Sequence, residues 1–316
     1  MQPKQFLEKK YTPMEVVKIV EMAQKDPDAL IQHSEEYYHQ QVEMVTHRIK
    51  MNLPNYKFIL LCGPSASGKT TTAHKLKDSL IRGGVGADIV SMDNFFLGIE
   101  RYSKLPDGSP DMESIKTMDL DLLNECFDEL LATGRSLLPT FDFVKQKQTK
   151  GVHLVEVSQD SVLIMEGIHA LNPDVLKDIP QKNVLRIYAS VRSKFVCGGE
   201  DILIPKDIRL MRRMVRDNMF RGYPPLSTLK SWENVLEGER KNINPYRDDV
   251  DVKLDNTIDY EVCVWHSKLQ SHLDMTGPED YADYPAVDRI FKGLTHFPSI
   301  DPAKIPPDSL LREFIG

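Results

Sequence analysis

The sequence lacks long apolar runs, paired cysteines and an excess of basic residues. No stretch of about eighteen apolar residues occurs among the 316, which argues against a membrane-spanning helix. The first residues also lack the apolar segment of a secretory signal. The four cysteines form no C-x-x-C pair, as expected for reduced thiols rather than a disulfide framework or zinc site. The net charge of −7 disfavours a general nucleic-acid-binding protein. We therefore expect a globular, cytoplasmic protein without membrane or nucleic-acid partners.

Residues 1–55 have the patterns of helices. Thr12-Pro13 is a cap-then-proline helix start, and the helix after it has an apolar face formed by Val16, Ile19, Val20 and Ala23. A second, more polar helix is expected over residues 28–50, and residues 52–55 should end it. We interpret this segment as a helical appendage for packing or for homo-oligomer formation, with a separate binding activity as the alternative.

Residues 56–275 alternate short apolar runs with helical patterns. We expect strands at residues 57–62, 87–91, 162–165 and 184–189, and helices at residues 69–81, 120–131, 207–220 and 227–240. This alternation predicts an α/β fold with a doubly wound parallel sheet. An inserted β-hairpin is expected over residues 138–157, a helical lid around residues 194–222, and a docked C-terminal tail over residues 276–316.

A phosphate-binding motif stands between the first expected strand and helix. Residues 63–70 fit the Walker A pattern G-x-x-x-x-G-K-[ST], which indicates a P-loop NTPase fold. Its glycines let successive N–H groups point at phosphate oxygens, and the helix start favours anions. Lys69 would reach the β- and γ-phosphates, and the Thr70 hydroxyl would bind Mg²⁺. ATP and Mg²⁺ are thus the expected cofactors, and the candidate nucleotide-binding residues are Gly63, Ser65, Ala66, Ser67, Gly68, Lys69, Thr70 and Thr71.

Two acidic residues follow other expected strands. Glu166 comes after the apolar residues 162–165, where a second acidic group of a P-loop protein would hold a magnesium-bound water. Asp93 lies just past the expected strand 87–91, beside the phosphate loop in a doubly wound sheet. A hydroxyl that attacks a terminal phosphate needs such a carboxylate to accept its proton. The chain has no N-K-x-D or L-S-G-G-Q motif, so a small-molecule kinase is favoured over a GTPase or a transporter.

Four arginines share one side of the expected helix 207–220. Arg209, Arg212, Arg213 and Arg216 fall within about a third of its circumference. We expect the flanking Asp207 and Asp217 not to neutralise them, so that an anionic ligand would offset their repulsion. The alternative is a solvated basic face paired with acids elsewhere in the chain. The helix would close over ATP as a lid, with a hinge at Arg221-Gly222. The acidic loop 105–113 could accept hydrogen bonds from the hydroxyls of a sugar.

Together these segments resemble the uridine kinase and phosphoribulokinase family, most of all its bacterial nucleoside kinase branch. The phosphate loop and residues 91–96, 138–143, 166–168 and 209–217 occur in the family's order, and the ending 305–316 resembles the tail of that branch. The resemblance covers about residues 57–316. It implies ATP-dependent phosphorylation of a nucleoside 5′-hydroxyl, with Asp93 as base, Asp111 as acceptor of ribose hydrogen bonds, and Arg213 and Arg216 as lid arginines.

The residues that would read the base depart from this pattern. Uridine kinases carry a tyrosine where this chain has Phe141 and a histidine where it has Gln146. Tyr223 replaces an arginine that contacts the nucleoside, and Ser231 lies near the position of a glutamine. Because hydrogen-bonding groups in a pocket set selectivity, the base preference is left open. The candidate substrate-binding residues are Asp93, Asp111, Phe141, Gln146 and Tyr223.

The leading hypothesis is an ATP- and Mg²⁺-dependent kinase for a small nucleoside-like acceptor, uridine or cytidine in type. Asp93, Lys69, Arg213 and Arg216 would be its catalytic residues. A second hypothesis is a kinase for another hydroxyl compound, such as a sugar phosphate or pantothenate. A third is a non-catalytic, ATP-sensing regulator, for which the N-terminal helices are the only support.

Overall fold

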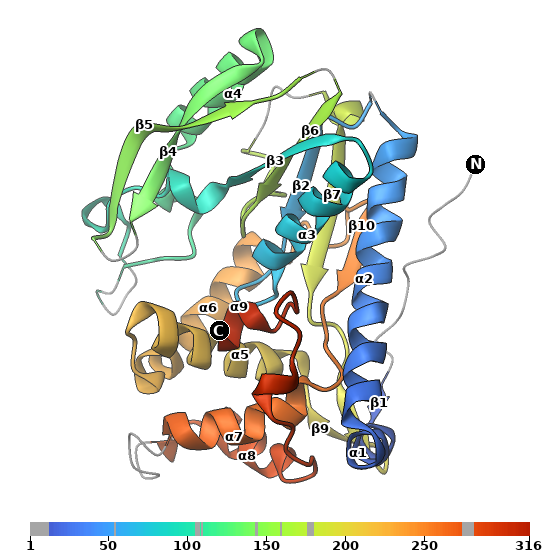
Figure 1. Ribbon diagram of the computed structural model, residues 1–316. Helices are drawn as coiled ribbons and strands as arrows, with labels where there is room; N and C mark the ends of the chain where they lie inside the picture. The colour runs from blue at the N-terminus through green and yellow to red at the C-terminus, as the bar shows by residue number, and fades with distance from the viewer. Residues whose placement is uncertain are drawn as a thin grey trace.

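A five-stranded parallel sheet forms the centre of the protein (Figure 1). The computed structural model describes residues 13–53, 55–104, 108, 110–142, 145–158, 160–175, 180–273 (backbone only for 270–273) and 281–316. The strand order is β10-β7-β2-β6-β3, and every neighbouring pair is parallel. The bounds are β2 Phe58–Cys62, β3 Gly86–Ser91, β6 Ser161–Glu166, β7 Val184–Ser190 and β10 Val252–Asp255. The predicted α/β fold with a parallel sheet is confirmed.

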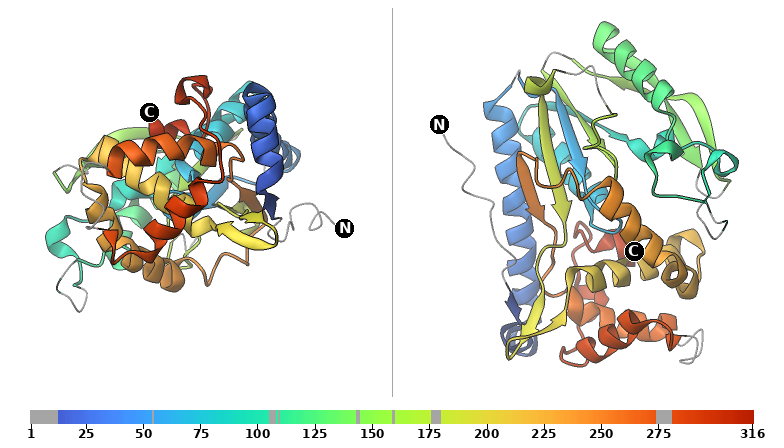
Figure 2. Two further views of the ribbon diagram at one scale, coloured as in Figure 1. Left: turned by 90° about the horizontal axis from the view of Figure 1, so that it is seen from below. Right: turned by 180° about the vertical axis from the view of Figure 1, so that it is seen from behind.

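The side chains of the central strand β2 alternate between two hydrophobic cores, one on each face of the sheet. Ile59 and Leu61 of β2 belong to a cluster that includes side chains of α2 (Pro27–Met51) and α3 (Lys69–Arg82). Phe58 and Leu60 belong to a second cluster with α4 (Leu120–Thr133). Successive strand residues point to opposite faces, so helices must cover both faces of a sheet whose central strand is wholly apolar. Figure 2 shows α2 and α4 on opposite sides of the sheet.

The predicted hairpin and helices are present, with small shifts at their ends. β4 (Arg135–Asp142) and β5 (Lys147–Glu156) pair in antiparallel fashion. α5 spans Pro205–Arg221 and α6 spans Pro225–Asn242, so each begins at a proline two residues before its expected start. Short 3₁₀ helices cover Met92–Phe95, Ile99–Arg101, Ile115–Thr117, Gln181–Asn183 and Pro302–Lys304.

The N-terminal helix starts later than predicted. Met14–Glu15 forms β1, which pairs in parallel with β8 (Phe195–Cys197), and α1 therefore begins at Val16 and runs to Lys25. Thr12, the predicted cap, lies outside the described residues. β9 (Glu200–Leu203) completes this small sheet inside the predicted lid segment. The sequence pattern missed it because each strand is too short to show alternation.

Helix α2 and the C-terminal helices both pack against the rest of the described structure. α2 buries a row of residues against it, and the Gln41 side chain exchanges two hydrogen bonds with the backbone of Asp255 in the edge strand β10. After α7 (Glu261–Leu273) and α8 (Pro285–Leu294), the chain ends in α9 (Arg312–Ile315), which lies beside α5 (Figure 1). In the described part of the chain, no helix has the length and apolarity needed to span a membrane.

Two substitutions on α2 test whether this helix is part of the core. Ile49 has 0% of its surface exposed and Met44 has 47%. Changing Ile49→Ala should lower the free energy of unfolding by about 2–5 kcal/mol, because it leaves a cavity. Met44→Ala on the same helix should change it by about 0.5 kcal/mol or less. Urea denaturation measures both, and equal small effects would show that α2 is dispensable.

Candidate functional site

The loop of residues 63–70 joins β2 to α3, as the motif predicts. Two of its residues have left-handed backbone conformations, Ala66 with φ of 59° and Gly68 with φ of 82°. Gly63 is required by close packing, because a β-carbon there would lie 2.1 Å from the carbonyl oxygen of Ala189. The chain can therefore curl tightly before it enters the helix, which gives the concave backbone typical of an anion-binding nest.

Side chains from distant segments hold the outside of this loop. Arg209 Nη1 donates to the carbonyl oxygen of Ser65 at 3.2 Å, and Arg212 Nη1 to that of Ala66 at 3.5 Å. Asn256 Nδ2, just past β10, donates to the carbonyl oxygen of Ser67 at 2.9 Å. Because these carbonyls are bound from outside, the inside of the loop is left for an anion.

Acids from other helices neutralise two arginines of the α5 stripe, as the alternative interpretation of the stripe expects. Arg209 pairs with Glu239 of α6 through both terminal nitrogens of its guanidinium group, Nη1 and Nη2. Arg212 makes a two-pronged contact with Glu261 of α7 at 2.7 and 2.8 Å, and both side chains are fully buried. These acids come from helices far along the chain, so spacing within α5 could not reveal them.

Asp217 also neutralises part of the stripe, contrary to expectation. Its carboxylate lies 3.3 Å from Arg213 Nε, 2.8 Å from Arg216 Nη2 and 3.4 Å from Arg221 Nη1. Burial lowers the pKa of Arg213, and Asp217 opposes that shift. Arg213 Nη1 also donates to Ser65 Oγ of the phosphate loop at 2.7 Å. Arg213 and Arg216 thus face a cavity, whereas Arg209 and Arg212 serve the structure.

A pocket of about 510 Å³ gathers half of the predicted site residues. Lys69 enters it from the phosphate loop, Asp93 from the 3₁₀ helix after β3, and Arg213 and Arg216 from α5. Ser65, Phe141, Gln146, Tyr223 and Ser231 also line it. Further aromatic walls come from Phe96, Tyr102 and Phe220, and the rings of Phe96 and Phe141 meet edge to face. The arrangement brings a cation, a carboxylate and apolar surfaces to one volume.

Glu113 lines this pocket together with Asp93 and Asp217, whereas the predicted Asp111 is not among its lining residues. Asp111 Oδ1 instead accepts a hydrogen bond from the Glu113 backbone N–H at 3.3 Å. Burial raises the pKa of Glu113 to about 7, with Arg213 opposing the shift and Glu239 adding to it. The sequence predicts that the acidic loop 105–113 lies at the site. Because an irregular loop has no periodicity, the sequence does not show whether Asp111 or Glu113 lines the pocket. Residues 105–107 and 109 of that loop lie outside the described residues.

Glu166 ends β6 beside the phosphate loop. Ser91 Oγ donates to its Oε1 at 2.7 Å, whereas its buried Oε2 has no hydrogen-bond partner among the described residues. Burial raises its pKa to about 7, Lys69 opposes the shift, and Asp93 adds to it. A buried, unpartnered carboxylate oxygen with Lys69 of the phosphate loop among its charged neighbours suits a hard cation such as Mg²⁺. Within the described residues, no three His, Cys, Asp or Glu side chains are grouped so that they could hold a metal ion.

Comparison with known proteins agrees with these features. The model of the phosphoribulokinase / uridine kinase family matches residues 58–262. A uridine kinase of Ureaplasma urealyticum is 23% identical over 198 residues, which cover 63% of this chain and 83% of that protein. Uridine-cytidine kinase A of Dictyostelium discoideum is 30% identical over 207 residues, 65% of this chain and 35% of that protein. A solved structure described as a possible uridine kinase from Bacillus stearothermophilus is 15% identical, with a TM-score of 0.47 over 68% of this chain and 98% of that one.

The raised pKa of Glu113 predicts a pH-dependent stability difference. A carboxyl group whose pKa rises from 4.5 to about 7 on folding stabilises the fold below pH 4.5, and this stabilisation is lost as the pH rises to about 7. Glu113→Gln keeps the neutral form at every pH. The variant should therefore gain on the order of 1 kcal/mol over the wild type at pH 8, and nothing below about pH 4.5. Thermal unfolding at both pH values measures this, and a pH-independent difference would contradict it.

Proposed function

The chain belongs to the phosphoribulokinase / uridine kinase family, and from that premise we propose that it transfers the terminal phosphoryl group of ATP to the 5′-hydroxyl of a nucleoside. One observation carries the proposal: Lys69 of the phosphate loop and Asp93 line the same pocket, with Arg213 and Arg216 beside them. Phosphoryl transfer needs a cation for the phosphates and a carboxylate for the incoming hydroxyl within one volume. Membership of a kinase family supports phosphotransfer itself.

In the proposed reaction Asp93 accepts the proton of the acceptor hydroxyl. The hydroxyl oxygen forms a bond to the terminal phosphorus while the bond from that phosphorus to the bridging oxygen breaks. Lys69, Arg213 and Arg216 stabilise the negative charge that develops on the phosphoryl oxygens and on the leaving group. The hydrogen bond from Arg213 to Ser65 supports this role, because it ties the arginine to the phosphate loop.

Thr70 and Glu166 are the proposed residues for Mg²⁺. The ion would neutralise charge on the phosphates when it is bound. The unpartnered Glu166 Oε2 supports this assignment, since a buried carboxylate oxygen is costly without a hydrogen bond or a cation.

The lining of the pocket favours a nucleoside over other hydroxyl compounds. Its aromatic side chains offer flat surfaces for a base, and Glu113 can accept hydrogen bonds from ribose hydroxyls. Arg213 and Arg216 lie against Asp217, which leaves less positive charge for an acceptor that carries its own phosphate. Gln146 and Tyr223 are the proposed contacts to the base edge. The names of the curated relatives, uridine kinase and uridine-cytidine kinase, support a pyrimidine nucleoside.

Removing the proposed base should abolish turnover without removing the donor. We expect Asp93→Asn to lower kcat by about 10²–10⁴-fold, because its amide cannot accept the proton. The affinity for ADP with Mg²⁺ should stay within about threefold, since the phosphate loop is unchanged. Asp111→Asn is the matched control and should retain turnover, because Asp111 does not line the pocket. Steady-state kinetics and calorimetry measure these quantities, and turnover by Asp93→Asn within a few-fold of wild type would refute the assignment.

An acceptor panel tests the nucleoside assignment. Purified protein with ATP and Mg²⁺ should release ADP with uridine or cytidine and respond at least about tenfold less, as kcat/KM, to sugar phosphates and pantothenate. A response confined to a sugar phosphate or pantothenate would replace the nucleoside with that acceptor. No response to any compound, with nucleotide binding retained, would favour the ATP-sensing regulator.

A further inference from the structure

The end of the chain lies directly on the helix that follows the phosphate loop. Leu310 packs so closely on the loop that a β-carbon built on Gly68 would lie 2.7 Å from its side chain. Phe314 is fully buried, and its ring centre lies 5.1 Å from the guanidinium carbon of Arg212. The hydroxyl of Tyr260, just past β10, lies 3.1 Å from Ser309 Oγ. Residues 305–316 are thus held at the loop by several independent contacts. They are the last part of the predicted docked segment 276–316, and from here on we call only residues 305–316 the tail.

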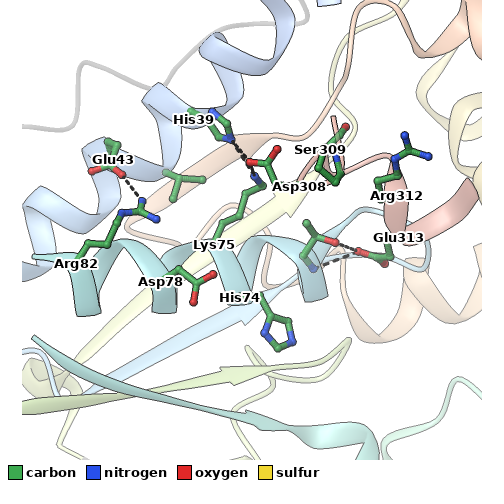
Figure 3. A pocket seen from close by; sticks show the side chains of 13 residues that line it. His39, Glu43, His74, Lys75, Asp78, Arg82, Asp308, Ser309, Arg312 and Glu313 are labelled. Atoms are coloured by element: carbon green, nitrogen blue, oxygen red, sulfur yellow. Dashed lines mark hydrogen bonds and ion pairs between the residues drawn. The ribbon is translucent and has the colours of Figure 1, made fainter. Parts of the chain in front are cut away.

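The carboxylate of Glu313, in the tail, binds at the N-terminus of α3, where anions bind favourably. Glu313 Oε2 accepts hydrogen bonds from the Thr71 backbone N–H at 3.2 Å and from Thr71 Oγ1 at 2.6 Å (Figure 3). Thr71 is the third residue of α3, so its N–H has no partner within the helix. The first N–H groups of a helix after a phosphate loop are those that bind phosphate oxygens. Glu313 therefore stands where a phosphate oxygen of a bound nucleotide would bind.

A groove opens beside this contact, between α2, α3 and the tail. It has a volume of about 590 Å³, which is in the range of small-molecule sites. In its wall, Lys75 Nζ lies 2.8 Å from His39 Nε2 and 3.1 Å from Asp308 Oδ2 (Figure 3). Thr71 and Glu313 also line the groove. The groove therefore extends to the first turn of α3.

We call the pocket of about 510 Å³ that contains Lys69 and Asp93 the acceptor pocket. It is lined by Ser65 and Lys69 of the phosphate loop, whereas the groove meets the chain just after the loop, at Thr71, and the two share no lining residue. If the terminal phosphate lies at Lys69 in the acceptor pocket, as the proposed function requires, the phosphate chain runs along the loop toward Thr71. The phosphate attached to the nucleoside then meets the Thr71 N–H, and the nucleoside extends toward the groove. Glu313 and that phosphate cannot bind the same N–H together, because two anions would compete for one donor.

We propose that Glu313 is a built-in competitor of the nucleotide donor, and that the nucleoside half of the donor enters the groove only when the contact between Glu313 and Thr71 opens. This inference rests on the proposed function for the direction of the phosphate chain. Its physical consequence is a reduced apparent affinity, because only the open fraction of the protein can bind the nucleotide. The tail thereby sets the nucleotide concentration at which the enzyme works, without contact to the acceptor.

Neutralising the competitor should strengthen nucleotide binding. We expect Glu313→Gln to bind ADP with Mg²⁺ about threefold to thirtyfold more tightly than the wild type, since a hydrogen bond to a charged group is replaced by one to a neutral amide. Asp301→Asn is the matched control. This change neutralises one carboxylate of the C-terminal segment outside the groove. The Asp301 carboxylate accepts a hydrogen bond from the Ala303 N–H, which the amide oxygen of asparagine can also accept, so the affinity should stay unchanged. Isothermal titration calorimetry without acceptor measures all three proteins.

A contact that only braces the fold would give a different result. Glu313→Gln would then bind ADP with the same or lower affinity and unfold at a lower temperature, and either binding result would overturn the proposal. If neither the wild type nor the variant bound ADP or ATP, the proposed donor itself would fail. If both proteins bound ADP equally and turned over substrate, the proposed role of Glu313 would be wrong while the proposed function would stand.

Hydrogen exchange on the unmodified protein gives a second test that needs no variant. Saturating ADP with Mg²⁺ should increase amide exchange in residues 309–316 by about threefold or more, because the nucleotide displaces Glu313 and loosens the tail. Exchange in α7, which lies outside the groove, should not increase and serves as the internal reference. Unchanged or slower exchange of the tail on binding would contradict the competition.

Discussion

The phosphate loop keeps its shape because side chains from distant segments bind its outward carbonyl oxygens. Arg209 and Arg212 of α5 and Asn256 after β10 hold three successive carbonyls, those of residues 65–67. A buried guanidinium group would be costly alone, so these contacts depend on Glu239 and Glu261 as partners. The loop, α5, α6 and α7 therefore form one linked set of charges, and loss of one partner would strand a buried charge and loosen the loop.

Because of these ion pairs, the four arginines of α5 have two different roles. Two of them are buried with their own carboxylates and shape the loop from outside. The other two, Arg213 and Arg216, line the pocket that contains Lys69 and Asp93, and they share Asp217. Because α5 both braces the phosphate loop and lines this pocket, the proposed function would connect nucleotide binding to the geometry of the acceptor site. That α5 moves as a lid stays a prediction, because many of its residues are buried and the structure shows the helix in one packed position.

The sequence was informative where a local pattern determines the structure. The phosphate loop has a fixed spacing, and the buried strand β2 is a continuous apolar run, so both could be located. Asp93 could be placed because carboxyl ends of parallel strands share one edge. Contacts between remote segments could not be predicted, as the partners of Arg209 and Arg212 show. The same holds for Glu113, whose irregular loop has no period, and for the three-residue strand β8, whose partner β1 lies far away in the chain.

The account depends most on a triphosphate that lies along residues 63–71 and ends between Lys69 and Asp93. A crystal structure with Mg²⁺ and a non-hydrolysable ATP analogue tests this directly. We expect the terminal phosphate in the pocket formed by Lys69, Asp93 and Arg213, and the Glu313 carboxylate displaced from Thr71. A phosphate chain bound elsewhere, or an Asp93 side chain turned away from the terminal phosphate, would contradict the account.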